Sequence, residues 1–240
     1  MQESVKLFVK VLAQTIPAAG PVYEFGSLQV PHQKGWADLR PFFPGIEYFG
    51  CDMRPGPGVD RVENLEHGLT IGDGQAAVVL SMETLEHVFD VFTAVREMKR
   101  VLRKDEAVLA MSSVMRFPIH GYPYDFWRFT PQGFVRLLAD MDVCLVGSHG
   151  DPRFPLSIFG VGVRTQRGRE HWRALLNEVS SRYTQELHLA MRYDRSVLRK
   201  AKLRFYRFWC AKAYEERVNR TKMTWTLHES EGRAAMKVAK

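Results

Sequence analysis

Three short apolar runs, each ending in glycine or an acid, constrain the fold of this chain more than any other feature. They lie within residues 22–27, 48–52 and 78–88. Such runs are typical of strands buried on both faces of a parallel sheet, whose polar ends then lie together at the carboxyl edge. Ligands of open α/β sheets bind at that edge, in the crevice where the strand order reverses. The sequence therefore predicts a doubly wound, mostly parallel α/β sheet with a ligand site built from its strand ends.

The rest of the first part of the chain alternates predicted helices and strands. Apolar residues at helical spacing and proline signals predict helices over residues 4–16 and 91–102 and one that begins at Thr130-Pro131. Further strands are expected over residues 107–113, 143–148 and 159–165. Because only a long loop without a helix joins the last two, they indicate an antiparallel hairpin at one edge of the sheet.

Charge is unevenly distributed along the chain. Residues 1–163 hold 15 Lys and Arg against 19 Asp and Glu, whereas residues 164–240 hold 19 against 8. An asymmetry of this size between two parts of a chain indicates two roles. We expect a domain at residues 1–165 that carries the ligand site, followed by a basic, aromatic-rich helical extension at residues 166–240.

Composition and cysteine usage argue against membrane-spanning, secreted and zinc- or disulfide-stabilised proteins. No apolar run approaches the roughly 18 residues of a membrane span, and the N-terminus mixes charged with apolar residues, unlike a signal peptide. The three cysteines, Cys51, Cys144 and Cys210, lack the paired spacing of a zinc site or of a disulfide framework. We therefore expect a cytoplasmic protein in a reducing compartment, without a metal site.

Three stretches carry a resemblance to a known family: E-F-G-S at residues 24–27, G-C-D-M-R at 50–54, and E-T-L-E-H-V at 83–88 followed by R-E-M-K-R-V-L at 96–102. With them, residues 20–165 resemble the class I S-adenosylmethionine-dependent methyltransferases, and the E-x-L-E-H-V motif is similar to that of a small bacterial branch. The aromatic stretch at residues 117–131 is also similar to one that recurs in that branch. The resemblance implies a Rossmann-like fold and S-adenosylmethionine (SAM) as the cofactor.

The resemblance also implies where the cofactor would lie. Glu24 and the turn at Gly26 and Ser27 would border its methionine end, with backbone N–H groups of the turn facing the ligand. Asp52 would accept hydrogen bonds from both ribose hydroxyls. Leu28 stands at a later glycine position of the nucleotide-binding pattern, which disfavours NAD because its pyrophosphate requires a close G-x-G-x-x-G approach.

The remaining cofactor contacts come from two other strand ends. Met53 would lie against adenine with Asn64 or Leu65 beside its edge, and Met82 and Glu83 would line the sulfonium side. These residue types suit the cofactor independently of the family. A cationic sulfonium favours nearby carboxylates, and adenine favours an apolar slot.

Residues 115–129 predict the site of the methyl acceptor, because this loop follows a strand end and is dense in aromatic and polar groups. Methyl transfer is an in-line displacement, so a base is needed only when the acceptor must lose a proton. His120 is the first candidate because an imidazole titrates near neutral pH. Tyr122, Tyr124 and Asp125 are the other candidates for this role.

Two alternatives stay open for the histidines near this loop. His120 can instead serve the structure, as a hydrogen-bond partner of backbone groups in a crowded loop. His87, which follows Glu83 by about one helical turn, faces either the cofactor or the core.

The leading hypothesis is a SAM-dependent methyltransferase that acts on oxygen or nitrogen of a small metabolite, such as a sugar or an intermediate of natural product biosynthesis. The chain has no D/N-P-P-Y motif for a nucleobase amine and no cysteine pair suited to carbon methylation of a base. One alternative is an RNA methyltransferase whose basic extension contacts phosphates. The other is a non-catalytic cofactor-binding or scaffold protein of the same fold.

The extension at residues 166–240 contains too many large aromatics to remain in water. Exposing Phe205, Phe208 and Trp209 would forgo roughly 1.5–3 kcal/mol for each side chain. We expect the extension to pack on its own domain, for instance over the acceptor cleft, or on a twin subunit as a homodimer through the C-terminal helices. Nucleic acid or a membrane surface is the less favoured partner, although basic residues interleave the aromatics.

Overall fold

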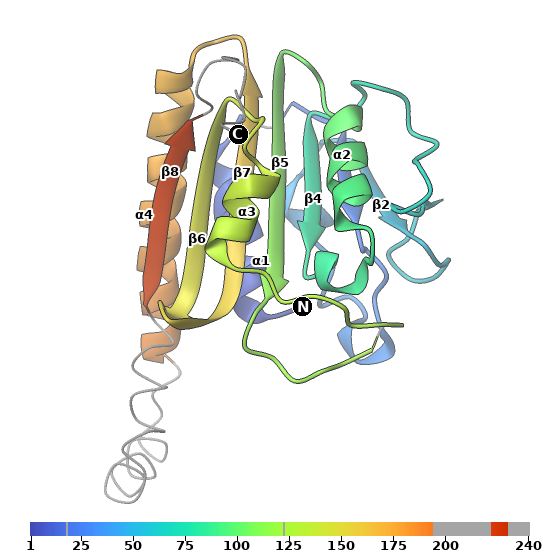
Figure 1. The fold of residues 1–240 in the computed structure, drawn as a ribbon, viewed down its shortest axis with the longest axis horizontal. Coiled ribbons are helices and arrows are strands. Elements are labelled where there is room, and N and C mark those ends of the chain that lie inside the picture. Colours follow the sequence, from blue (N-terminus) through green and yellow to red (C-terminus); the bar gives the residue numbers. More distant parts are fainter. Residues whose placement is uncertain (18, 122, 194–221, 230–240) are drawn as a thin grey trace, which may run out of the picture.

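A mixed sheet forms the centre of the computed structural model, which describes residues 1–17, 19–121, 123–193 and 222–229. The described strands form one eight-stranded sheet in the order β3-β2-β1-β4-β5-β7-β6-β8 (Figure 1). Five of them are parallel: β1 (Val22–Phe25), β2 (Tyr48–Asp52), β3 (Arg61–Val62), β4 (Val78–Met82) and β5 (Glu106–Val114). The others join through antiparallel pairs: β6 (Val143–Asp151), β7 (Phe154–Thr165) and β8 (Met223–Glu229). The predicted Rossmann-like sheet with an antiparallel edge is confirmed.

The strand order reverses at β1, which lies between β2 on one side and β4 on the other. In register, Glu24 pairs with Gly50 of β2 and with Leu80 of β4. The residues that follow these three parallel strands therefore lie side by side at one edge of the sheet. This is the edge at which the sequence predicts a ligand.

Helices cover both faces of the sheet (Figure 1). The helices α2 (Val91–Val101) and α3 (Pro131–Leu137) lie on one face, and α1 (Glu3–Thr15) and α4 (Arg169–Tyr193) lie on the other. Short polar side chains cap the N-termini of α2 and α3. The side chain of Asp90 accepts a hydrogen bond from the Thr93 N–H, and that of Thr130 accepts one from the Gly133 N–H. The predicted helices are thus found within one or two residues of their expected ends.

The face under α1 and α4 contains an aromatic cluster that joins the C-terminal segments to the sheet. The ring centroids of Phe8 and Phe159 lie 4.8 Å apart, and Tyr183 packs edge-on against Phe8 at 5.6 Å. The hydroxyl of Tyr183 donates to the Ser4 carbonyl at 3.0 Å. The described part of the extension therefore packs on its own domain, which was one of the expected arrangements.

Two features of the antiparallel part differ from the sequence expectation. The strands β6 and β7 meet in a tight hairpin instead of a long loop, with an irregular register at Gly150, whose φ is +107°. Residues 223–229, expected in a helical extension, form β8 instead, and Trp225 of β8 lies across from Gly147. A Cβ atom on Gly147 would lie 2.3 Å from the Trp225 ring, so this pairing requires glycine there.

The aromatic residues Phe205, Phe208 and Trp209 and the cysteine Cys210 lie outside the described residues. Across the described part of the chain, no helix is both long and apolar enough to cross a lipid bilayer.

Candidate active site

A cavity of about 320 Å³ lies at the carboxyl edge where the strand order reverses. Its volume is within the range of small-molecule sites, roughly 300–1,000 Å³. It is lined by all nine residues that the sequence analysis assigns to the cofactor: Glu24, Gly26, Ser27, Asp52, Met53, Asn64, Leu65, Met82 and Glu83. His120 of the loop at residues 115–129 lines the same cavity.

Glu24, on β1, is a buried carboxyl group with one side-chain hydrogen bond. The hydroxyl of Tyr48 donates to Glu24 Oε2 at 2.7 Å. Burial raises the pKa of Glu24 to about 7, because the ionised form loses its hydration. A cation in the cavity would favour the ionised form, so this group can respond to a positively charged ligand.

The turn at Gly26 and Ser27 depends on glycine, but its N–H groups do not face the cavity. Gly26 has φ of +86°, and a Cβ atom there would lie 2.0 Å from Thr84 Oγ1. The N–H groups of Gly26 and Ser27 both donate to the Cys51 carbonyl, at 2.8 and 3.1 Å. The expectation that these two N–H groups face the ligand is therefore wrong, because they fasten the end of β1 to β2. Ser27 Oγ is buried without a hydrogen-bond partner among the described residues.

Asp52, at the end of β2, accepts one backbone hydrogen bond on each of its two carboxylate oxygens. Oδ1 accepts from the Arg54 N–H at 3.1 Å, and Oδ2 accepts from the Leu28 N–H at 3.4 Å. Burial raises the pKa of Asp52 above its ordinary value. Each oxygen keeps a further lone pair, so the fixed carboxylate can accept from two neighbouring hydroxyl groups.

The residues beside Asp52 form a slot with one apolar and one polar side. Leu65 is buried, and Met53 is 47% exposed at the mouth of the cavity. Asn64 Oδ1 accepts from the Glu66 N–H at 2.9 Å, which fixes the amide. Such a slot suits a flat heterocycle with polar atoms at its edge.

Glu83, directly after β4, has a strained backbone and a partly buried side chain. Its φ is +51°, the one positive value among the described non-glycine residues. Its Oε2 accepts from the Gln2 N–H at 3.0 Å, whereas Oε1 is buried without a hydrogen-bond partner in the described part of the chain. Strain of this kind is concentrated at functional sites.

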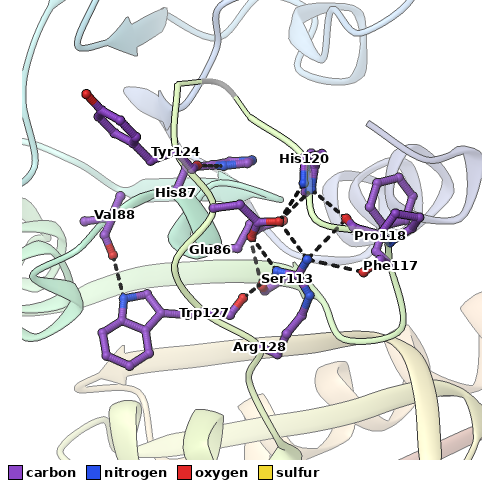
Figure 2. A network of polar contacts seen from close by, with 11 residues as sticks. Glu86, His87, Val88, Ser113, Phe117, Pro118, His120, Tyr124, Trp127 and Arg128 are labelled. Carbon is purple, nitrogen blue, oxygen red and sulfur yellow. Dashed lines mark hydrogen bonds and ion pairs between the residues drawn. The ribbon is translucent and has the colours of Figure 1, made fainter.

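The loop at residues 115–129 is organised around Asp125. Two of its partners, His120 and Arg128, are seen close together in Figure 2. The Asp125 carboxylate accepts from the His120 N–H at 2.9 Å and pairs with both terminal nitrogens of Arg128. The guanidinium of Arg128 holds the pKa of Asp125 well below its usual range. Asp125 does not line the cavity, and its contacts suit the positioning of His120 better than proton transfer. Tyr122 lies outside the described residues.

His120 and His87 meet in the wall of the cavity, so His87 faces the cavity and not the core. Their ring centroids lie 4.8 Å apart in an edge-on contact, and both rings line the cavity. Next to them, Glu86 is fully buried and accepts from the Ser113 hydroxyl at 2.9 Å. Burial raises the pKa of Glu86 to about 7.

The sequence does not by itself indicate a role for Glu86, and the spacing of the cysteines predicts no metal site. In the structure, one ligand atom from each of Glu86, His87 and His120 lies within 4.8 Å of the others. The signal was present in the E-x-L-E-H-V motif, which places an acid next to a histidine. Because His120 lies far from this motif in the sequence, the motif alone does not indicate the cluster.

Comparison with known proteins supports the class that the fold indicates. The model of the methyltransferase domain family matches residues 51–110. A SAM-dependent methyltransferase from Archaeoglobus fulgidus has 13% identity and a TM-score of 0.52, over 67% of this chain and 93% of its own. A chain from the complex of the Haloferax volcanii Trm112 methyltransferase activator with a methyltransferase has 15% identity and a TM-score of 0.50, over 70% and 92%. No curated protein matches the sequence.

At these low sequence identities, the structural similarity shows the fold alone. The match to the methyltransferase domain model indicates the class of protein. The chain therefore carries a SAM-dependent methyltransferase domain with the class I fold. SAM follows as its cofactor.

The stability of the ligand-free protein is expected to fall as the pH rises from about 5 to about 8. Glu24 and Glu86 have pKa values of about 7 when folded, above the ordinary value of 4.5, so over this range the folded chain keeps protons that the unfolded chain releases. Each carboxyl group then lowers the free energy of unfolding by up to about 3 kcal/mol.

Denaturation of the Glu86→Gln variant at several pH values measures one of these contributions. The amide stays neutral, so the stability of the variant relative to wild type should rise by up to about 3 kcal/mol between pH 5 and pH 8. The exposed Glu170→Gln variant is the control and should follow wild type. An equal pH dependence in all three proteins would show that Glu86 titrates as an ordinary carboxyl group.

Proposed function

We propose that this chain transfers the methyl group of SAM to oxygen or nitrogen of a small metabolite. The observation that carries the proposal is one continuous cavity, which joins the ends of β1, β2 and β4 to His87 and His120. A cofactor bound along the strand ends would direct its methyl group toward the histidines. Cofactor and acceptor would then meet in line, which is the placement that methyl transfer requires.

The charges along the cavity support the cofactor pose implied by the resemblance. The buried Glu24 and the partly buried Glu83 supply two carboxyl groups for the methionine end, where the cofactor carries its positive charge. Asp52 offers the two-oxygen acceptor for the ribose, and Met53 and Leu65 offer apolar contact for adenine. Ser27, whose hydroxyl has no hydrogen-bond partner among the described residues, is a further candidate for the methionine end.

The acceptor end supports a hydroxyl or amine that loses a proton. His120 lines this end, and Asp125 orients its ring through Nδ1 at 3.0 Å. A base held in this way suits proton removal from an acceptor whose nucleophile is weak while protonated. A small acceptor, such as a sugar or a natural-product intermediate, is the class that we propose for this end.

Asp52→Ala is expected to weaken SAM binding by about tenfold to a hundredfold, because hydrogen bonds to a charged group are worth roughly 1.5–3 kcal/mol. Titration calorimetry measures the dissociation constant. Asp73→Ala is the matched control, because Asp73 is exposed and pairs only with Arg100 in the described residues. An affinity of Asp52→Ala equal to that of wild type would remove Asp52 from the cofactor site.

Transfer of a labelled methyl group from SAM tests the reaction itself. We expect transfer to small hydroxyl- or amine-bearing acceptors, with a rate that changes little between about 50 and 200 mM salt. Transfer to RNA that falls steeply over the same range would instead support the RNA methyltransferase. Binding of SAM without transfer to any acceptor class would support the non-catalytic alternative.

We also propose that the protein works in the cytoplasm and that its C-terminal helices mediate a homodimer. Leu189, 54% exposed on α4, is one apolar residue available for such a contact. Light scattering on the purified full-length chain measures the oligomeric state. A monomer over the whole concentration range would contradict the dimer.

A further inference from the structure

We infer that Glu86, His87 and His120 form a binding site for a divalent transition-metal ion at the acceptor end of the cavity. Two imidazole nitrogens and one carboxylate oxygen from these residues lie within 4.8 Å of one another. All three residues line the cavity that we assign to the cofactor and the acceptor. The inference rests on the proposed function for the role of the ion, but the ion site itself does not.

Hydrogen bonds at Nδ1 of both imidazole rings leave Nε2 as the nitrogen available to a metal ion. His87 Nδ1 lies 2.5 Å from the Tyr124 carbonyl oxygen, which only accepts, so this nitrogen carries the proton (Figure 2). His120 Nδ1 lies 3.0 Å from Asp125 Oδ2, which the Arg128 pair keeps ionised. In the neutral rings, each Nε2 then holds the free lone pair. Histidines that bind metals commonly donate their other N–H to a carbonyl or a carboxylate in this way.

The buried carboxylate of Glu86 independently indicates a ligand. Its side chain is fully buried, and the Ser113 hydroxyl satisfies Oε2. The other oxygen, Oε1, is buried without a hydrogen-bond partner among the described residues. A buried polar atom without a partner lowers stability, and a bound cation would satisfy this oxygen.

The ligand set selects the class of ion. Mg²⁺ and Ca²⁺ favour sites made only of oxygen, whereas two imidazoles with one carboxylate suit Zn²⁺, Mn²⁺, Co²⁺ or Fe²⁺. Bonds of about 2.0–2.2 Å around such an ion place its ligand atoms roughly 3–3.5 Å apart, so the three side chains would close slightly on binding. Three protein ligands also leave a position open, which is the arrangement of catalytic metal sites.

The open position would take the hydroxyl oxygen of the acceptor. With the ion bound, His120 would act as its ligand and not as the base, and the ion would instead lower the pKa of that hydroxyl, whose proton would pass to water. An oxygen lone pair would then form the bond to the methyl carbon, and the sulfur–methyl bond would break with its electron pair on sulfur. The sulfonium thereby becomes the neutral thioether of S-adenosylhomocysteine.

Titration with Co²⁺ tests the site without cofactor or acceptor. Protein dialysed against a chelator should bind one Co²⁺ per chain and develop the visible absorption of a metal with nitrogen ligands. His120→Gln and Glu86→Gln should weaken this binding by about tenfold or more, since each removes one direct ligand. The control variant His171→Ala changes an exposed histidine of α4 and should bind as wild type does.

Thermal melting of each variant shows whether it is folded, and binding of S-adenosylhomocysteine is measured in parallel. Retained S-adenosylhomocysteine binding with loss of Co²⁺ binding in His120→Gln would support the metal site. Absence of Co²⁺ binding in a wild-type protein that binds S-adenosylhomocysteine would overturn the metal site alone. Equal Co²⁺ affinity in wild type, His120→Gln and Glu86→Gln would also overturn it.

Discussion

A chain that ends at residue 165 is expected not to fold. Its truncation removes α4, which buries Trp172, Leu176, Val179 and Tyr183 against the sheet and α1. Burial of each such side chain contributes roughly 1.5–3 kcal/mol, so their sum is comparable to the 5–15 kcal/mol of net stability typical of a domain. Truncation also uncovers β6, whose neighbour β8 is lost. The measurements are soluble yield and far-ultraviolet circular dichroism.

Two point variants separate the packing of α4 from other effects of the truncation. Tyr183→Ala should lower the free energy of unfolding by about 3–5 kcal/mol, the range for removal of a large buried aromatic side chain. Tyr183 is fully buried, whereas Gln185 on the same helix is exposed. Gln185→Ala should therefore change stability little. A soluble truncated protein with wild-type circular dichroism and SAM affinity would mean that the extension is an independent docking arm.

Turnover is expected to fall by about 10²–10⁴-fold in His120→Ala, the usual effect of losing a general base. The affinity for SAM should change little, because we propose His120 for the acceptor end of the cavity and Asp52 and Glu24 for the cofactor end. Single-turnover methyl transfer with saturating SAM measures the rate. A pH profile shows whether the lost group titrated near neutrality.

The control for this experiment is His67→Ala, because His67 is exposed and does not line the cavity. Tyr122→Phe tests the alternative base in the same assay. If His120→Ala and Tyr122→Phe both keep wild-type turnover, the loop at residues 115–129 supplies binding surface only. The acceptor would then need no base from the protein.

The parts of the fold that were predictable are those encoded by local composition. Buried parallel strands such as Val78–Met82 are continuous apolar runs, so their positions and their polar ends can be read without tertiary information. Because parallel strands share one carboxyl edge, the gathering of Glu24, Asp52 and Glu83 at one cavity follows from the order of the elements.

The rest could not be predicted because it depends on contacts between distant segments. The strand β8 forms because Gly147 leaves room for Trp225, a pairing that the local pattern of either strand does not indicate. The N–H groups of the Gly26 turn are occupied by the Cys51 carbonyl, which requires the exact pairing of β1 with β2. The meeting of His87 and His120 depends on how the loop folds back around Asp125 and onto Glu86, whose carbonyl accepts from the Phe126 N–H.

A crystal structure of the full-length chain with S-adenosylhomocysteine is the most direct test of the cofactor site. We predict that both ribose hydroxyls lie within hydrogen-bond distance of the Asp52 carboxylate, with the amino-acid end beside Glu24 and Ser27. The thioether sulfur should lie toward Met82 and His120. Binding of S-adenosylhomocysteine elsewhere on the protein, or a ribose without contact to Asp52, would contradict the assignment of this cavity.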